Sequence, residues 1–268
     1  MRTEQVTSPS NPKLKRLLAL QEKSSLRRSE GLFVVEGRRE TENLLEAGFV
    51  PETLFICREL FPLPEFLLEK AAGANPDLLV VELPKALYAK AAYRESTEGV
   101  IAEVRCRDLS LDDLHLSENP LIVVLEAVEK PGNLGAVLRS ADAAGADAVV
   151  ICDPLTDLYN PNLIRASLGA AFTVPCVACT SGEAIAWLKR RGIRILTAQL
   201  QDSSLYYDVP MTGGTAIVMG TESTGLTDEW RRAADAHIRI PMLGTLDSLN
   251  VSVSAAILLF EAVRQRQG

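Results

Sequence analysis

The sequence predicts an α/β protein whose larger part is a parallel β-sheet covered by helices on both faces. Short apolar runs typical of strands alternate with amphipathic runs typical of helices from residue 30 onwards. Glycines and prolines stand at many of the joins, as expected for turns. The alternation pauses once, in a polar and acidic segment at residues 108–119, which predicts a linker between two domains. With 268 residues, of which 47% are hydrophobic and 24% charged, the chain can bury a sizeable core.

The first 28 residues differ in charge from the rest of the chain. They hold seven Lys and Arg against two Glu, a net charge of +5, whereas the whole chain has a net charge of −7. We therefore predict a basic N-terminal arm at residues 1–29 that contacts phosphate groups, with a solvated helix face as the alternative. The acidic remainder argues against a protein that coats nucleic acid indiscriminately.

Residues 30–107 are predicted to form a small α/β domain. Its expected strands are at residues 32–35, 53–57, 78–82 and 99–104. Its expected helices are at residues 38–47, 64–72 and 84–92. The linker at residues 108–119 follows, and residues 120–268 are predicted to form the larger domain.

In this larger domain every expected strand except the one at residues 193–199 leads into an expected helix. Strands are expected at residues 121–128, 147–152, 172–179, 193–199, 215–220 and 237–241. Helices are expected at residues 134–144, 161–170, 182–191, 226–234 and 250–265. This order predicts parallel strands, and ligands of such open sheets bind beyond the carboxyl ends of the strands.

Composition also argues against several classes of protein. No apolar run is long enough to span a bilayer, and Met1–Leu20 lacks the apolar segment of a secretory signal, so we expect a cytoplasmic protein. The five cysteines are scattered, and we expect them to be reduced. Cys176 and Cys179 form a C-x-x-C pair, but the chain has only two histidines and no second cysteine pair. We therefore expect no metal site and interpret the cysteines as structural.

Three loops between strands and helices carry the polar residues that point to chemistry. The first, Pro131–Arg139, places Asn133 at a tight glycine turn, although Asn133 could simply cap the following helix. The second, Gly220–Leu226, has the glycine spacing of a phosphate-binding loop, but Leu226 replaces the lysine that such loops need. The third, Ser248–Ser254, leads into the last apolar helix. None of them has the G-x-G-x-x-G pattern of a dinucleotide site.

In order and spacing, these loops resemble the three motifs of the SpoU/TrmH family of RNA ribose 2'-O-methyltransferases, part of the SPOUT class. The resemblance implies a C-terminal SPOUT domain with a trefoil knot that binds S-adenosylmethionine and methylates a ribose 2'-hydroxyl of structured RNA. Because Phe33–Arg38 is similar to the entry of the family's substrate-binding domain, residues 30–107 are expected to bind RNA. Ribosomal RNA is the expected substrate. Transfer RNA, or a non-catalytic RNA-binding or ribosome-assembly role, is the alternative.

The resemblance assigns roles residue by residue. The catalytic candidates are Arg139, acting on the 2'-hydroxyl, with Asn133, Glu222, Ser248 and Asn250. The cofactor-binding candidates are Thr197, Met219, Gly220, Ile240 and Leu249. The RNA-binding candidates are Arg38, Asn162, Arg165 and Ser167. An arginine stays protonated in almost any site, so Arg139 could clamp a phosphate or stabilise alkoxide charge rather than act as a base. Ser248 and Asn250 could also cap the last helix.

Two departures from the family pattern concern the substrate more than the chemistry. Lys130 stands where many relatives have an acidic residue, and Ser223-Thr224 replaces the glycine-rich centre of the second motif. Residues 251–263 are mostly apolar, more than one buried helix face requires. Together with the resemblance, which implies an active site completed at a subunit interface, this predicts a homodimer.

Overall fold

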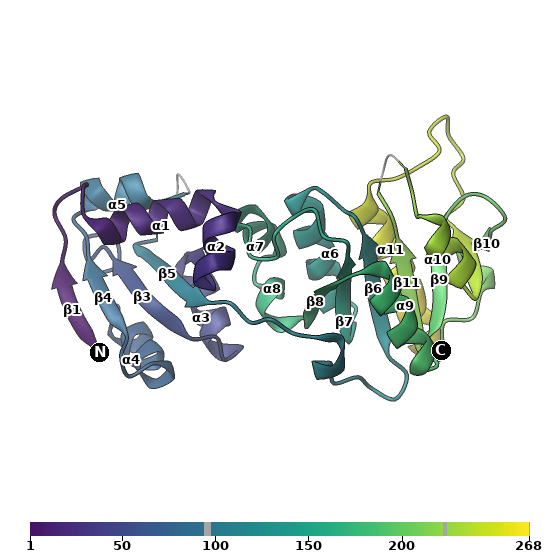
Figure 1. The fold of residues 1–268 in the computed structure, drawn as a ribbon, viewed down its shortest axis with the longest axis horizontal. Helices are drawn as coiled ribbons and strands as arrows, with labels where there is room; N and C mark the ends of the chain where they lie inside the picture. Colours follow the sequence, from purple (N-terminus) through teal and green to yellow (C-terminus); the bar gives the residue numbers. More distant parts are fainter. Residues whose placement is uncertain (94–97, 222–223, 268) are drawn as a thin grey trace. The chain divides into compact units, whose positions relative to one another are not determined.

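The computed structural model describes residues 1–93, 98–221 and 224–267. The chain forms two compact units (Figure 1). The first comprises Met1–Arg107 together with Tyr159–Ile164, and the second comprises Asp108–Leu158 and Arg165–Gly268. The segment Tyr159–Ile164 thus belongs to the first unit although the residues on either side of it belong to the second.

The first unit is built on a five-stranded sheet in the order β1-β4-β3-β5-β2. Its strands are β1 (Arg2–Gln5), β2 (Leu32–Glu36), β3 (Pro51–Ile56), β4 (Leu79–Glu82) and β5 (Val100–Arg105). Its helices are α1 (Pro12–Glu22), α2 (Ser24–Glu30), α3 (Arg38–Glu46), α4 (Glu65–Ala74) and α5 (Lys85–Ala91). β1, β4 and β3 run parallel, whereas β5 is antiparallel to both of its neighbours.

Residues 1–29 are part of this unit and not a separate arm. β1 pairs with β4 at the edge of the sheet, and α1 packs Leu14, Leu17 and Leu20 into the core, each at most 1% exposed. Arg27 is buried as well, and its guanidinium donates to the carbonyl of Leu20 (2.6 Å). The prediction of a separate basic arm was wrong. The leucines of this segment recur at helical spacing, and they are buried in the core despite the positive charge around them.

The second unit is built on a seven-stranded sheet in the order β10-β12-β9-β11-β6-β7-β8, and all of its strand pairs are parallel. Its strands are β6 (Leu121–Glu126), β7 (Ala148–Cys152), β8 (Cys176–Cys179), β9 (Arg194–Ala198), β10 (Ser204–Leu205), β11 (Thr215–Met219) and β12 (Ala236–Arg239). Its helices are α6 (Pro131–Ala143), α8 (Ala170–Thr173), α9 (Ser181–Arg190), α10 (Asp228–Ala233) and α11 (Val251–Gln267). α7 (Pro161–Ser167) spans the boundary between the two units.

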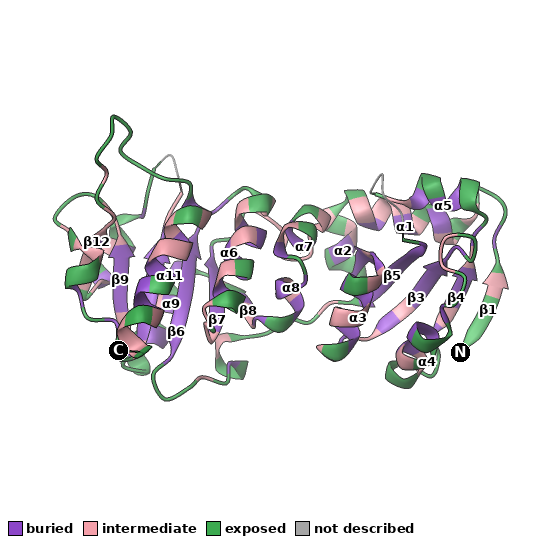
Figure 2. Ribbon diagram, turned by 180° about the vertical axis from the view of Figure 1, so that it is seen from behind, coloured by how far each residue is buried: buried purple, intermediate pink, exposed green. Residues whose placement is uncertain are grey.

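Helices cover both faces of this sheet, as the sequence predicted. Ile122 and Val124 of β6 pack against Trp187 of α9 and Trp230 of α10. On the opposite face α6 and α11 pack against each other, and α11 also contacts β11. Strand residues are therefore buried on both sides, while the outer faces of the helices are exposed (Figure 2). The helices cover the two faces of the sheet but not the ends of its strands. The carboxyl ends of the strands are therefore where a ligand can bind.

Several boundaries differ from prediction by a few residues, and two of these differences have a clear local cause. The expected strand at residues 172–179 begins only at Cys176, because α8 occupies residues 170–173 and Pro175 separates the two elements. The expected helix at residues 134–144 begins earlier, since Pro131 stands at its first position, where proline fits a helix without losing a hydrogen bond. The trefoil knot stays a prediction from the resemblance. Within the described residues, none of the helices is long and apolar enough to cross a bilayer.

Candidate functional site

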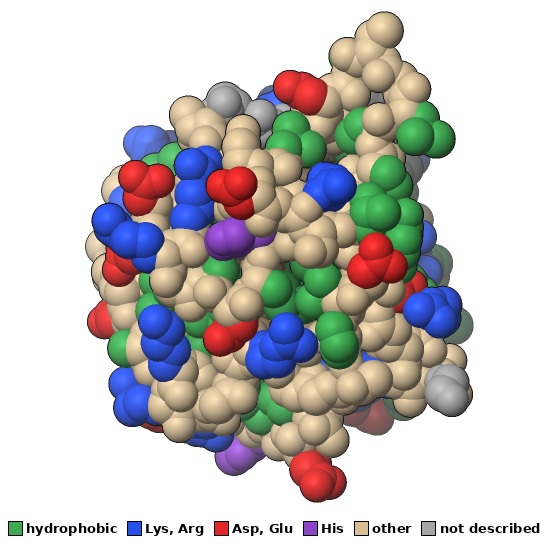
Figure 3. Space-filling view, turned by 90° about the vertical axis from the view of Figure 1, so that its right-hand side faces the viewer, with side chains coloured by type: hydrophobic (Ala, Val, Ile, Leu, Met, Phe, Trp, Pro, Cys, Tyr) green, Lys and Arg blue, Asp and Glu red, His purple; other side chains and the backbone are tan. Residues whose placement is uncertain are grey.

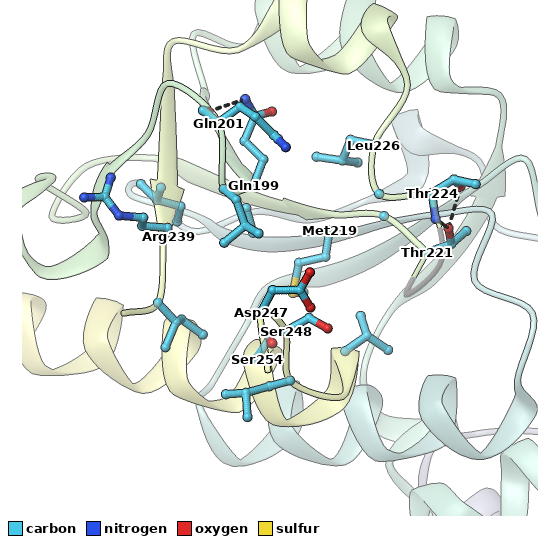
Figure 4. Close-up of a pocket in the computed structure, with 18 of the residues that line it drawn as sticks. Gln199, Gln201, Met219, Thr221, Thr224, Leu226, Arg239, Asp247, Ser248 and Ser254 are labelled. Atoms are coloured by element: carbon cyan, nitrogen blue, oxygen red, sulfur yellow. Dashed lines mark hydrogen bonds between the residues drawn. The ribbon is translucent and has the colours of Figure 1, made fainter. Parts of the chain in front are cut away.

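A pocket of about 330 Å³ lies where three neighbouring parallel strands end, β9, β11 and β12 (Figure 4). The loops that follow these strands and the start of α11 form its walls. The lining includes Met219, Gly220, Ile240, Ser248 and Leu249, five of the residues singled out from the sequence. A pocket of this size falls in the range of small-molecule sites, and its place at the carboxyl edge agrees with where open α/β sheets bind ligands.

The loop after β11 can fold back closely on itself because Gly220 has no side chain. A Cβ at this position would lie 2.6 Å from the nitrogen of Leu226 and closer still to the carbonyl of Gly225. The loop is closed by Gly225 N–H, which donates to the Thr221 carbonyl (3.1 Å), and Gly225 has a φ of +67°. Glu222, the predicted motif carboxylate, lies outside the described residues.

The pocket combines apolar walls with a few polar groups. Met219, Leu226 and Val251 are all less than 9% exposed. Asp247 and Ser248 project towards Met219 on one side, and Thr221 and Thr224 stand on the other (Figure 4). Sequence reasoning missed most of the polar lining, namely Gln199, Gln201, Thr221, Arg231, Arg239, Asp247 and Ser254. Of these residues, Asp247 had the clearest signal in the sequence, because it directly precedes the motif residue Ser248.

Two asparagines join the first and third loops. Asn250 Nδ2 donates to Asn133 Oδ1 (3.2 Å), so the start of α11 is tied to the first turn of α6. The Oδ1 atom of Asn250 accepts from the backbone N–H of Ser252 (3.0 Å), which caps α11. Capping and a contact in the site therefore coexist in one side chain. Asn133 itself lies inside the first turn of α6 and is not the residue before it, so the N-cap alternative for Asn133 was wrong.

Arg139 is exposed and lies on α6, six residues after Asn133. Six residues correspond to about 9 Å along a helix and about 240° around it, so the two side chains leave different faces. Arg139 does not line the pocket of its own chain, and it makes no hydrogen bond or ion pair with any described residue. The structure thus does not bring the predicted catalytic arginine to the predicted cofactor residues within one chain.

Thr197 lies one residue before the pocket-lining end of β9. It is fully buried, and its hydroxyl is hydrogen-bonded to Nδ1 of His237 on the neighbouring strand β12 (2.6 Å). Its side chain is not part of the pocket lining. The structure therefore does not support a side-chain contact from Thr197 to a ligand.

A buried carboxylate at the end of β6 holds the loop that leaves the pocket. Glu126 is 3% exposed, and its carboxylate accepts from the Thr227 backbone N–H (2.9 Å) and from the Thr227 hydroxyl (2.7 Å). Ser181 connects to the same cluster: its hydroxyl donates to Asp153 (2.6 Å) and accepts from Trp230 Nε1 (2.9 Å). The chain between Gly220 and Thr227 is thus anchored at both ends, by β11 and by Glu126.

Two of the four predicted RNA-binding residues are engaged in contacts within their own units. The guanidinium of Arg38 donates to the carbonyls of Glu98 (2.8 Å) and Leu60 (2.5 Å) and lies over the ring of Phe61, so it stabilises the first unit. Ser167 is 1% exposed and accepts from the backbone N–H of Ala171. These contacts argue against direct RNA contacts by Arg38 and Ser167.

The other two candidates remain accessible. Asn162 is exposed and accepts from the hydroxyl of Tyr93 (3.0 Å) within the first unit. Arg165 is exposed and belongs to the second unit. RNA binding by Asn162 and Arg165 stays a prediction.

The cysteines are all free thiols. Cys152 and Cys179 are opposite each other on β7 and β8 and interact through their side chains. Burial raises the pKa of Cys176 to about 12, which makes it a poor nucleophile. Among the described residues no group of three or more His, Cys, Asp or Glu side chains could hold a metal ion.

Comparison with known proteins identifies the family to which the chain belongs. A model of the SpoU rRNA methylase family matches residues 120–260, and a model of the MRM3-like substrate binding domain matches residues 11–102. The chain belongs to the SpoU rRNA methylase family. The second match begins at residue 11, inside the segment that was expected to be a separate arm, in agreement with the place of α1 in the first unit.

Full-length relatives support the same assignment. The chain is 33% identical over 270 residues to the 23S rRNA (uridine(2479)-2'-O)-methyltransferase of Streptomyces viridochromogenes, covering 96% of this chain and 91% of that protein. It is 28% identical over 258 residues to RlmP of Bacillus subtilis, a 23S rRNA (guanosine(2553)-2'-O)-methyltransferase, covering 96% and 98%. The crystal structure of an AdoMet-bound rRNA methyltransferase from Sinorhizobium meliloti is similar with a TM-score of 0.90, 30% identity and 98% of both chains covered.

Proposed function

We propose that the protein transfers a methyl group from S-adenosylmethionine to a ribose 2'-hydroxyl of ribosomal RNA. The observation that carries the proposal is the pocket at the ends of β9, β11 and β12, joined through Asn250 and Asn133 to the turn that opens α6. Leu249 and Val251, the two neighbours of Asn250, line the pocket, so this polar contact lies beside it. The relatives that cover nearly the whole chain are named as 23S rRNA 2'-O-methyltransferases.

The residues around the pocket fit the cofactor. Met219, Leu226 and Ile240 supply apolar surface for an adenosine and a methionine chain, and the absence of a side chain at Gly220 lets the backbone of Gly225 and Leu226 pack against the end of β11. When bound, the cofactor would supply a sulfonium methyl group. Asn133 and Asn250 would orient the ribose, since an amide can donate to one oxygen and accept from another. Orientation of this kind can lower a barrier by up to about 7–11 kcal/mol.

Arg139 is proposed to stabilise negative charge on the reacting 2'-oxygen, because a guanidinium stays protonated and is a poor base. It is exposed and lies away from the pocket of its own chain. We therefore propose that it acts in the pocket of a second copy in a homodimer.

The surface of α11 supports the dimer. Val253 and Phe260 are 47% and 49% exposed, and Ile257 lies between them on the same face of the helix. Apolar side chains also gather at one side of the face seen in Figure 3, where charges of both signs are otherwise interspersed. An exposed apolar stripe of this kind favours burial against another chain.

A complementation experiment tests the trans arrangement of Arg139. Arg139→Ala and a pocket variant, Gly220→Ala, should each be inactive as homodimers. Mixed by co-expression with different affinity tags, they should give heterodimers in which one pocket keeps both Gly220 and an Arg139 from the partner. Recovery of part of the methyl transfer supports the proposal, whereas heterodimers that stay inactive contradict it.

The first unit is proposed to select the RNA, supported by its match to a substrate binding domain and by exposed cations such as Lys15, Lys23, Arg28 and Arg39. An RNA substrate of this kind also supports the expected cytoplasmic location. The relatives do not identify the target nucleotide of this protein, because one of them acts on a uridine and another on a guanosine.

The activity itself is tested with labelled S-adenosylmethionine on 23S rRNA, assembled large subunits and transfer RNA. Digestion to nucleosides and mass spectrometry should reveal a 2'-O-methyl nucleoside from ribosomal RNA only, and Arg139→Ala should serve as the inactive control. Methylation of transfer RNA alone would replace the substrate in this proposal. Tight RNA binding with no 2'-O-methyl nucleoside in any digest would favour a non-catalytic assembly factor.

A further inference from the structure

The pocket has few charged side chains, and these differ in how many of their polar atoms already have a hydrogen-bond or ion-pair partner. The described lining contains three charged side chains, Arg231 on α10, Arg239 at the end of β12 and Asp247 before α11. Arg239 Nη1 is in contact with the hydroxyl of Ser203 (3.4 Å). Arg231 has a different arrangement, because one edge of its guanidinium is engaged and the other is not.

The engaged edge of Arg231 faces its own helix. Nη1 lies 3.6 Å from the carboxylate of Asp228, one turn earlier in α10. The Nε atom, in contrast, is buried and has no hydrogen-bond partner among the described residues. Nη2 lies 4.0 Å from the point where a Cβ of Gly225 would stand, and Gly225 is itself part of the pocket lining. The Nε–Nη2 edge is therefore next to the pocket loop.

A buried N–H without an acceptor is unfavourable unless a ligand supplies one. The Nε and Nη2 atoms of an arginine form a planar fork whose two parallel N–H groups match the two oxygens of a carboxylate. S-adenosylmethionine carries a single carboxylate, on its methionine part, and otherwise bears positive charge on its sulfonium and ammonium groups. The carboxylate is thus the one anionic group on this cofactor with which an arginine in the pocket lining can form a charge-assisted pair.

We propose that Arg231 binds the methionyl carboxylate of S-adenosylmethionine through its Nε–Nη2 edge. The assignment rests on the proposed function, since it presumes this cofactor. It makes Arg231 a residue that determines the specificity for the amino-acid part of the ligand, whereas the apolar walls and the Gly220 loop hold the adenosine. Asp228 fixes the guanidinium from the other side by its contact with Nη1.

The test is isothermal titration of the full-length protein with two ligands, S-adenosylmethionine and decarboxylated S-adenosylmethionine, which lacks only the carboxylate. Arg231→Met removes the charge and the fork but keeps the aliphatic stem, Arg231→Lys keeps the charge without the fork, and Arg239→Met is the matched control. Arg231→Met should weaken S-adenosylmethionine binding about 10- to 100-fold, the scale of a charge-assisted hydrogen bond. It should leave binding of the decarboxylated ligand unchanged, and Arg231→Lys should be intermediate.

Several results would overturn the assignment. Equal weakening of both ligands by Arg231→Met would mean that the arginine only supports the fold, which melting curves of the variant would show as well. A selective loss in Arg239→Met instead would move the carboxylate to that residue. Unchanged cofactor affinity with weakened RNA binding would mean that Arg231 contacts an RNA phosphate. Failure of the wild-type protein to bind either ligand would overturn the proposed function itself.

Discussion

Replacement of Glu126 gives the sharpest test of how the fold holds the loop that lines the pocket after β11. The Glu126 carboxylate accepts two hydrogen bonds from Thr227, at 2.9 Å from the backbone nitrogen and 2.7 Å from the hydroxyl, across 101 residues of sequence. Glu126→Ala removes both acceptors and leaves a cavity at the end of a central strand. Thr227 is itself exposed, so water can replace part of what is lost. Two hydrogen bonds to a charged acceptor and the cavity together predict a loss of about 2–4 kcal/mol in the free energy of unfolding.

Glu126→Gln should be much milder, for a geometric reason. The amide oxygen can take the place of the carboxylate oxygen that accepts from the Thr227 N–H. The amide NH₂ then faces the Thr227 hydroxyl, which can rotate and accept instead of donating. Both contacts survive at nearly unchanged volume, so we expect a loss of at most about 1 kcal/mol, typical of exchanging a charged acceptor for a neutral one.

Urea unfolding followed by circular dichroism measures both values. If the two units unfold separately, the change should be confined to the transition of the second unit, and the two transitions are then fitted apart. Titration with S-adenosylmethionine should show weaker binding for Glu126→Ala, because Leu226 and Gly225, just before Thr227, line the pocket. A Glu126→Ala protein within about 0.5 kcal/mol of wild type, the range of ordinary surface substitutions, would refute the reasoning. So would a Gln variant as unstable as the Ala variant.

The other predictions concern the pocket, the chemistry and the dimer. Gly220→Ala places a Cβ against the Gly225 carbonyl and should abolish measurable S-adenosylmethionine binding in titrations while the circular dichroism spectrum stays native. Arg139→Ala should lower methyl transfer by on the order of a hundredfold or more with cofactor affinity unchanged; full activity would remove it from the site. Phe260→Asp, at a residue of α11 that is 49% exposed, should give monomers in light scattering, whereas Phe66→Asp on the first unit should leave the mass unchanged.

Much of this fold follows from local patterns in the sequence. The ten expected strands and the eight expected helices are all present because apolar runs of strand length alternate with helical periodicity, a signal that needs no long-range information. The N-terminal segment is the exception: Leu14, Leu17 and Leu20 have helical spacing, but the seven basic residues around them favoured a separate phosphate-contacting arm. The short strands β1 and β10 gave no comparable signal.

The site was less predictable, because its decisive contacts join distant residues. Sequence identified Met219, Gly220 and Ser248 through a motif, and the structure brings them into one pocket. Nothing local distinguished Arg231 from other helical arginines, since the pocket that it lines is completed by residues distant in sequence, such as Gln199 and Leu249. Glu126, in contrast, has a signal in the sequence. A carboxylate at the end of an otherwise apolar strand needs a hydrogen-bond partner, and the structure shows that this partner is Thr227.

Two sets of polar contacts connect the pocket with the turn that opens α6. Glu126, at the end of β6, holds the loop that closes the pocket, and the chain that leaves Glu126 goes on to form the turn with Asn133. Asn250, between two pocket-lining residues, returns to that same turn through its contact with Asn133 Oδ1. A ligand that orders the pocket therefore stabilises the position of Asn133 from both sides. Since a reacting hydroxyl must be aligned with the methyl group before transfer, cofactor binding should prepare the amide that orients the ribose.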